Sequence, residues 1–256
     1  MADSKLKIDI RRNKILEGLR AQGRVSVAQL SAELGATPVT IRNDLAALER
    51  DGYLTRIQGG AVQIPRRETL LDAQEVKCAS QKQQISQAAA DMIRDGETLF
   101  INSGTTTRQL AKCLTGKQNL SIVTNSLAVA MELGTVPHFK VLLLGGEINA
   151  RYGFTYGGDV QEQLSKYQAD WAILSVDGVS TRCGVTTHHA EEAIIDRMMI
   201  SNAKQVMIVA DSSKIGRAGF SRICDCDSGI WLITNAECDP QAAGELRDSG
   251  VRMHTA

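Results

Sequence analysis

The chain has 256 residues, about the size at which a single hydrophobic core stops growing, so we expect two domains. The formal net charge is zero, but residues 1–67 carry 12 Lys or Arg against 7 Asp or Glu, a net +5, which leaves a net −5 for residues 68–256. A basic head on an acidic body is typical of a polyanion-binding module joined to a domain with another task, and excludes neither enzyme nor regulator.

Several classes of protein are disfavoured by the composition. No apolar run approaches the roughly 20 residues that a membrane span needs, and the N-terminus lacks the apolar stretch of a signal peptide, so we expect a cytoplasmic protein without a membrane partner. The cysteines form no C-x-x-C pair and no set with zinc-ligand spacing, which predicts free thiols and neither a metal nor another cofactor. They are Cys78, Cys113, Cys183, Cys224, Cys226 and Cys238.

Two helices are expected before residue 36. Residues 8–22 place apolar side chains among Arg and Lys, the pattern of an amphipathic helix with a basic outer face. Ser26-Val-Ala-Gln29 is a capping-box pattern, so a second helix starts at Val27, and Gly35 is the expected stop. A third helix follows after this tight turn, which is the order of a helix-turn-helix.

The third helix has the features of a recognition helix. Thr37 can cap it, and Pro38 fits its first position, where a missing N–H costs nothing. At helical spacing Ile41, Leu45 and Leu48 form an inward stripe. Arg42 is predicted on the flank, and the residues predicted to point outward are Val39, Thr40, Asn43, Ala47 and Arg50. Asn can pair with adenine, Arg with guanine or phosphate, and a methyl group with thymine in a major groove. Each residue alone would also fit a solvent-exposed helix face.

A β-hairpin, or wing, is predicted next. Tyr53–Ile57 and Ala61–Ile64 flank Gln58-Gly59-Gly60, and such a wing can lay Arg56 or Gln58 along the phosphate backbone or in the minor groove. We therefore expect a DNA-binding domain over residues 1–64, a charged linker over 65–80 and a second domain over 81–256. The predicted DNA-contacting residues are Arg12, Ser26, Thr37, Val39, Thr40, Arg42, Asn43, Arg56 and Gln58.

The second domain alternates apolar strand patterns with helical patterns, which predicts a mostly parallel α/β sheet covered by helices. The predicted strands are Thr98–Asn102, Ser121–Thr124, Lys140–Leu144, Trp171–Val176, Val206–Ala210 and Ile230–Thr234. The predicted helices are Gln83–Arg94, Thr106–Leu114, Leu127–Leu133, Val160–Lys166, Glu191–Ala203 and Pro240–Asp248.

Polar and glycine residues follow five of these strands. Such sheets bind ligands at the carboxyl ends of their strands, where backbone N–H groups can hold a phosphate and carboxylate or amide groups can bind hydroxyls. The segments are Ser103–Thr107, Thr124–Ser126, Gly145–Glu147, Asp177–Gly178 and Asp211–Lys214. Each segment alone would also fit ordinary turn and capping chemistry. His188-His189 is not expected to bind a metal, because adjacent side chains diverge.

The motifs TIRNDLAALERDGYLTRIQGGA, SGTTT, TNS, LLLGGE, VDGVSTRCGVTT and VADSSK occur in this order along nearly the whole chain. In this the sequence resembles the DeoR family of bacterial transcriptional repressors. The resemblance implies a winged helix-turn-helix joined to a Rossmann-like effector domain similar to ribose-5-phosphate isomerase. It also implies repression of a carbohydrate operon, a phosphorylated sugar as inducer, operator DNA as partner, and a homodimer or homotetramer.

The family's motifs can be carried over residue by residue. The recognition-helix motif falls on Thr37, Thr40, Ile41, Arg42, Asp44 and Leu45. The effector motifs fall on Ser103, Gly104, Thr105, Thr106, Thr124, Asn125, Gly145, Gly146, Asp177, Gly178, Asp211 and Lys214. With them we count Thr107, Glu192 and Arg197 as candidate effector-binding residues. Where many members read E-A-x-x-K-R this chain has Asp196, so an inducer with an amino group or a shifted phosphate is conceivable. The segments GVTTHHAEEA and GRAGFSRIC resemble members that govern amino-sugar and hexitol pathways.

Two other functions fit parts of the sequence. A sugar-phosphate isomerase needs a carboxylate base and a group that stabilises the enediolate; Asp177 and Glu192 offer carboxylates, but no basic partner is expected near Asp177, because Lys214 follows another strand. Alternatively, the second domain only forms oligomers. We expect a regulator without catalytic residues.

Overall fold

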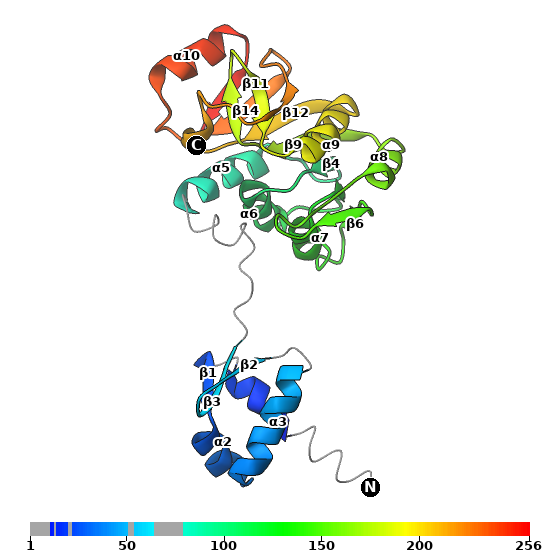
Figure 1. The fold of residues 1–256 in the computed structure, drawn as a ribbon. Helices are drawn as coiled ribbons and strands as arrows, with labels where there is room; N and C mark the ends of the chain where they lie inside the picture. The colour runs from blue at the N-terminus through cyan, green and yellow to red at the C-terminus, as the bar shows by residue number, and fades with distance from the viewer. Residues whose placement is uncertain (1–10, 13, 20–21, 51–53, 64–78) are drawn as a thin grey trace. The chain divides into compact units, whose positions relative to one another are not determined.

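The computed structural model divides into two compact units, Met1–Glu68 and Thr69–Ala256 (Figure 1). It describes residues 11–12, 14–19, 22–50, 54–63 and 79–256. The predicted linker lies outside this part of the chain up to residue 78, and its last two residues, Ala79 and Ser80, begin a helix. Cys78 also lies outside it, and the other five cysteines are free thiols.

The first unit contains the predicted helix-turn-helix. Residues 11–12 and 14–19 are helical, and two further helices follow, α2 (Val27–Leu34) and α3 (Pro38–Arg50). Ser26 Oγ accepts a hydrogen bond from the N–H of Gln29, and Gly35 ends α2 in the left-handed conformation. Thr37 Oγ1 accepts one from the N–H of Thr40. Both predicted caps and both helix starts are therefore confirmed.

The wing is a three-stranded antiparallel sheet in the order β1-β3-β2. Its strands are β1 (Arg24–Ser26), β2 (Leu54–Ile57) and β3 (Gly60–Gln63). Ile57 pairs with Gly60, so the turn is Gln58-Gly59 alone and the prediction that Gly60 belongs to it was wrong. Strand β1 was not predicted, because three residues are too few to show alternation.

The core of the first unit lies between these helices and the wing. Its buried members are Ile15, Leu19, Val25, Val27, Leu30, Ile41, Leu45, Leu48, Leu54 and Ala61. The predicted inward stripe of α3 is thus confirmed. The prediction that Ala47 points outward was wrong: it is 7% exposed, because α3 packs against β2 and β3.

The second unit is built on a seven-stranded parallel sheet in the order β15-β14-β12-β9-β4-β5-β6. The strands are β4 (Thr98–Ile101), β5 (Ser121–Thr124), β6 (Lys140–Leu143), β9 (Ala169–Ser175), β12 (Ala203–Val209), β14 (Ile230–Thr234) and β15 (Arg252–Thr255). The six predicted strands all occur: β5 and β14 have the predicted bounds, and the ends of the other four lie within three residues of the predicted ones. Only β15 was missed, because Arg252 and His254 interrupt any apolar run.

Helices cover both faces of the sheet. Side chains from α5 (Ala79–Asp91), α6 (Thr105–Leu114) and α7 (Leu127–Leu133) pack in the cluster around Leu99 and Ile173. Side chains from α8 (Gly158–Leu164), α9 (Ala190–Ser201) and α10 (Pro240–Asp248) pack in the other cluster, around Phe100 and Leu174. This is the predicted mostly parallel, Rossmann-like α/β fold.

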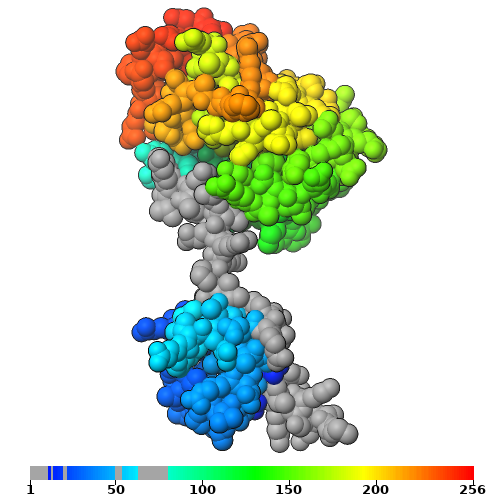
Figure 2. Space-filling view, in the orientation of Figure 1, coloured from blue at the N-terminus to red at the C-terminus, as the bar shows by residue number. Residues whose placement is uncertain are grey.

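The second unit also contains short elements that were not predicted, and they lie outside the seven-stranded sheet. They are the hairpin β7 (Glu147–Asn149) and β8 (Phe154–Tyr156), the antiparallel strands β10 (Gly178–Ser180), β11 (Gly184–Thr187) and β13 (Ser221–Cys224), and the 3-10 helix η1 (Ser212–Lys214). Figure 2 shows the two units in a space-filling view. No helix among the described residues has the length and apolar character that a membrane crossing requires.

Candidate nucleic-acid interface and polar pocket

The start of α3 presents the surface predicted to read DNA. Val39 is 62% exposed, and Arg42 and Asn43 are exposed, while Thr40 is half-buried. Thr37 caps the helix by accepting the N–H of Thr40, and this contact also brings the two hydroxyl oxygens within 2.9 Å of each other. A short, polar, methyl-bearing face of this kind suits a helix whose first turns enter a major groove.

Two of the predicted DNA-contacting arginines have partners within the protein. Asp44, 3% exposed on α3, accepts hydrogen bonds from Arg11 Nε at 2.5 Å and Arg12 Nε at 3.1 Å. On the other side, Arg56 Nε lies 2.8 Å from Glu49 Oε2 in an exposed ion pair. Hydrogen bonds from the Arg56 backbone and side chain lower the pKa of Glu49. Both arginines therefore tie α3 to its neighbours, and their contact with phosphate stays a prediction.

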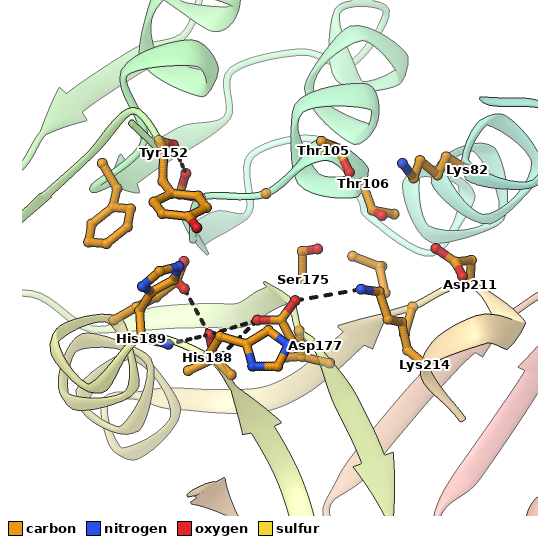
Figure 3. A pocket seen from close by; sticks show the side chains of 18 of the residues that line it. Lys82, Thr105, Thr106, Tyr152, Ser175, Asp177, His188, His189, Asp211 and Lys214 are labelled. Carbon is orange, nitrogen blue, oxygen red and sulfur yellow. Dashed lines mark hydrogen bonds and ion pairs between the residues drawn. The ribbon is translucent and has the colours of Figure 1, made fainter. Parts of the chain in front are cut away.

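The second unit contains a polar pocket of about 290 Å³ at the carboxyl ends of β4, β9 and β12 (Figure 3). Its walls come from the segments that follow these strands, from α5 and α9, and from the β7–β8 hairpin. The lining side chains that carry polar or aromatic groups include Lys82, Ser103, Thr105, Thr106, Tyr152, Phe154, Ser175, Asp177, Thr187, His188, His189, Glu192, Asp211, Ser213 and Lys214.

One side of the pocket is suited to an anion. It includes Gly104, at the N-terminus of the ten-residue helix α6, where no side chain caps the free N–H groups. Figure 3 shows Thr105 and Thr106 on the same side as Lys82. Because Gly104 has no side chain, the backbone at the start of α6 can lie close to Ser175. A Cβ on residue 104 would lie only 2.5 Å from Ser175 Cβ. Unsatisfied N–H groups, hydroxyls and an ammonium are the groups that proteins use to hold phosphate.

The opposite side is acidic. Asp177 Oδ2 accepts a hydrogen bond from the His188 N–H at 2.9 Å, and Lys214 Nζ lies 3.5 Å from Asp177 Oδ1. Glu192 enters from α9, and its Oε2 lies 2.9 Å from Thr187 Oγ1. Burial, and then the nearby Asp196 and Asp177, raise the pKa of Glu192 well above its ordinary value. The expectation that Asp177 lacks a basic partner was wrong, because η1 carries Lys214 across from β12 towards the end of β9.

Asp196, the residue that departs from the family pattern, lies behind Glu192 and does not line the pocket. It is fully buried, and Asn102 Nδ2 lies 3.1 and 3.2 Å from its two oxygens. Burial raises the pKa of Asp196 to about 8, although the hydrogen bond from Asn102 and the charge of Arg197 act in the other direction.

Aromatic side chains close one wall. The Tyr152 and His189 rings lie 4.1 Å apart between centroids, and Phe154 lies 5.9 Å from His189. Ser103 Oγ donates a hydrogen bond to the Tyr152 carbonyl at 3.3 Å, which links the β7–β8 hairpin to the segment after β4. Rings of this kind can stack on the apolar face of a sugar.

Eight of the predicted effector-binding residues come together in the pocket: Ser103, Gly104, Thr105, Thr106, Asp177, Glu192, Asp211 and Lys214. The other seven do not line it: Thr107, Thr124, Asn125, Gly145, Gly146, Gly178 and Arg197. Several of these hold the surrounding segments. Thr124 Oγ1 donates to the Ile101 carbonyl, Thr107 Oγ1 to the Asn102 carbonyl, and Arg197 to the Arg222 carbonyl.

Sequence reasoning missed Lys82, Tyr152 and the histidines as pocket residues. Lys82 and Tyr152 come from elements whose position depends on the tertiary fold, so no local signal marks them. His188 and His189 directly follow β11, a strand too short to be predicted. Among the described residues, no group of three or more His, Cys, Asp or Glu side chains is placed to hold a metal ion.

Residues 11–67 match the model of the DeoR-like helix-turn-helix domain, and residues 77–236 match that of the DeoR C terminal sensor domain. The chain belongs to the DeoR family. It is therefore a DNA-binding transcriptional regulator and not an enzyme, which settles the isomerase alternative.

Curated relatives match this DeoR-family chain along almost its whole length. A putative aga operon transcriptional repressor from Escherichia coli O157:H7 is 32% identical and covers 95% of this chain and 92% of its own. The glycerol-3-phosphate regulon repressor of Escherichia coli K12 is 34% identical over 95% of this chain and 97% of its own. The repressor GlcR of Bacillus subtilis is 32% identical over 93% of both chains.

Solved structures give weaker likenesses. The full-length sorbitol operon regulator SorC from Klebsiella pneumoniae has a TM-score of 0.41 at 15% identity, covering 93% of this chain and 99% of that one. Ribose 5-phosphate isomerase A from Methanocaldococcus jannaschii also has a TM-score of 0.41, at 14% identity, covering 54% and 55% of the two chains. TM-scores below 0.5 do not establish any shared function.

Proposed function

We propose that this protein represses a carbohydrate uptake or catabolism operon and leaves its operator when a phosphorylated sugar, amino sugar or hexitol fills the polar pocket. The observation that carries the proposal is the pocket's composition within a family sensor domain: the N-terminus of α6 with hydroxyls and Lys82 on one side, and the carboxylates of Asp177 and Glu192 on the other. The first group suits a phosphate and the second suits hydroxyl or amino groups.

Release from DNA requires that the effector bind the off-DNA arrangement more tightly than the DNA-bound one. A coupling of roughly 1–3 kcal/mol would weaken operator binding by about 5- to 150-fold. A single small winged helix makes few base and phosphate contacts, so we propose a homodimer or homotetramer that places two heads on a palindromic or repeated operator. The division into a DNA-binding domain over 1–64, a linker over 65–80 and an effector domain over 81–256 belongs to this proposal, except that Ala79 and Ser80 are part of α5.

The test is a fluorescence anisotropy titration of the full-length protein on duplexes from its own chromosomal neighbourhood, with a panel of sugar and hexitol phosphates. We expect salt-sensitive binding to one duplex and release by one member of the panel. Unchanged operator affinity across the whole panel would contradict phosphosugar induction.

For the recognition helix we expect Arg42→Ala and Asn43→Ala each to weaken specific binding by about 1–3 kcal/mol and to alter base preference. Both side chains are exposed at the start of α3. The measurement is anisotropy on the operator and on random DNA of the same length. Equal losses on both duplexes would remove the base-reading role of Asn43.

For the pocket we expect Lys214→Met to weaken the binding of a hexose phosphate by ~1.5 kcal/mol, about tenfold, because Asp177 loses its ion-pair partner and its unbalanced charge repels the phosphate. Lys204→Met is the matched control, since Lys204 pairs with Asp170 and is not a pocket residue. Isothermal titration calorimetry measures both variants. If alanine at Ser103, Thr105 and Lys214 leaves operator release untouched, the second domain only forms oligomers.

A further inference from the structure

The acidic side of the pocket contains more carboxyl groups than its own cation can balance. Glu192 is 7% exposed, and the ionisable groups that act on its pKa are two further carboxyls, Asp196 and Asp177. Lys214 pairs with Asp177. A ligand that places a positive charge beside Glu192 would therefore balance the charge of this carboxyl when it is ionised.

Hydrogen bonding around Glu192 leads to the same conclusion. Thr187 Oγ1 lies 2.9 Å from Glu192 Oε2 and 3.2 Å from Asp177 Oδ2, but a hydroxyl has one proton and can donate to only one of them. Asp177 also accepts the N–H of His188, so the charged form of Glu192 is the carboxylate that depends on this shared donor. A group with several N–H donors would satisfy both acceptors at once.

We infer that Glu192, with Asp177 and Thr187 beside it, forms a subsite for a protonated amino group, so that the effector is a phosphorylated amino sugar with a free amine. This rests on the proposed function, which supplies the phosphate at the N-terminus of α6. An ammonium has three donors and no acceptor, which matches a wall of two carboxyls and a hydroxyl oxygen. An N-acetyl group or a plain hydroxyl in that place lacks the charge.

Binding of such a ligand is linked to proton release. Burial raises the pKa of both Glu192 and Asp196, so both carboxyls keep their protons to a higher pH than an exposed carboxyl does. An ammonium beside Glu192 favours its charged form and lowers its pKa, so the complex holds fewer protons than the free protein. The affinity for the amine then rises with pH through the pKa of the free protein, as long as the ligand's amine stays charged. The charged and titratable groups around Glu192 are Asp177, Lys214, His188, His189, Asp196 and Arg197.

The experiment is isothermal titration calorimetry of the full-length protein with three matched ligands: a hexosamine 6-phosphate, its N-acetyl derivative and the parent hexose 6-phosphate, in both the gluco and the galacto series. We expect the free amine to bind at least about tenfold more tightly than the other two, because a charge-assisted hydrogen bond replaces a neutral one. Titrations in two buffers of different ionisation enthalpy should show proton release, and Glu192→Gln should abolish both the release and the preference.

Asp196→Asn is the second variant, because it keeps the side-chain shape and removes a carboxyl that acts on Glu192 without lining the pocket. We expect less pH dependence in this variant, with the preference for the amine retained. Equal affinity for the amine and the hexose phosphate in wild-type protein would overturn the inference while leaving the proposed function intact. If no phosphosugar of the panel binds, the proposed function fails and the inference fails with it.

Discussion

Gly60→Val is expected to weaken operator binding by at least about 100-fold. Gly60 opens β3, the central strand of the wing, where it pairs with Ser26 on one side and Ile57 on the other. A Cβ at this position would lie 2.0 Å from the Val25 carbonyl oxygen and 3.0 Å from Ser26 Cα, and both are backbone atoms of β1 that cannot rotate away. Since β1 leads directly into α2, the strand cannot move without displacing the helix-turn-helix.

The expected cost to the stability of the first unit is about 3 kcal/mol, the upper end of the range typical of overpacking, because the clash is with backbone atoms. Denaturant unfolding measures it, and anisotropy should show operator affinity at least about 100-fold lower. Gly59→Asn is the matched control. Gly59 has a φ of 82°, a conformation that Asn tolerates, and no atom lies within 4 Å of its added Cβ, so near-normal binding is expected. Wild-type affinity for Gly60→Val would show that the wing does not support the reading head.

The elements of the first unit that could be predicted from sequence are those with local signals. The Ser26 and Thr37 caps and Gly35 fix the ends of α2 and α3 through contacts within four residues, so both starts were correct. Strand β1 and the role of Gly60 depend on pairing between segments more than thirty residues apart, and no local pattern reveals that. The burial of Ala47 is of the same kind, because it follows from the position of the wing.

In the second unit, too, the strands have local sequence signals and were predicted, whereas the composition of the pocket depends on tertiary structure. Buried parallel strands are continuous apolar runs, so six of the seven were predicted. The rule that ligands lie at the carboxyl ends of strands brought together Ser103, Asp177 and Lys214. It also included Thr124, the last residue of β5, and Gly145, which follows β6. These two strands lie on the other side of β4, and neither residue lines the pocket. Which strand ends meet is decided by strand order, and strand order was not predicted.

Asp44→Ala is expected to destabilise the first unit by about 2–3 kcal/mol. Its carboxylate joins the N-terminal helical residues Arg11 and Arg12 to α3, so removing it leaves two guanidinium groups without their acceptor. Breaking a fully buried ion pair costs roughly 3–5 kcal/mol, and we expect less here because the side chains of Arg11 and Arg12 are 21% and 31% exposed. The loss should appear in denaturant unfolding and as weaker binding to any duplex.

Glu49→Ala is the matched control on the same helix. It also removes a carboxylate from an arginine, but the Glu49–Arg56 pair is 38% and 46% exposed, and exposed pairs contribute about 0–1 kcal/mol. Arg12→Ala then separates two roles of one residue. If Arg12 only supports Asp44, the Arg12→Ala variant keeps the wild-type salt dependence of DNA binding. If Arg12 contacts a phosphate, the slope of log K against log salt concentration falls by about one in this variant. Equal stability of Asp44→Ala and Glu49→Ala would show that the buried ion pair does not hold the reading head together.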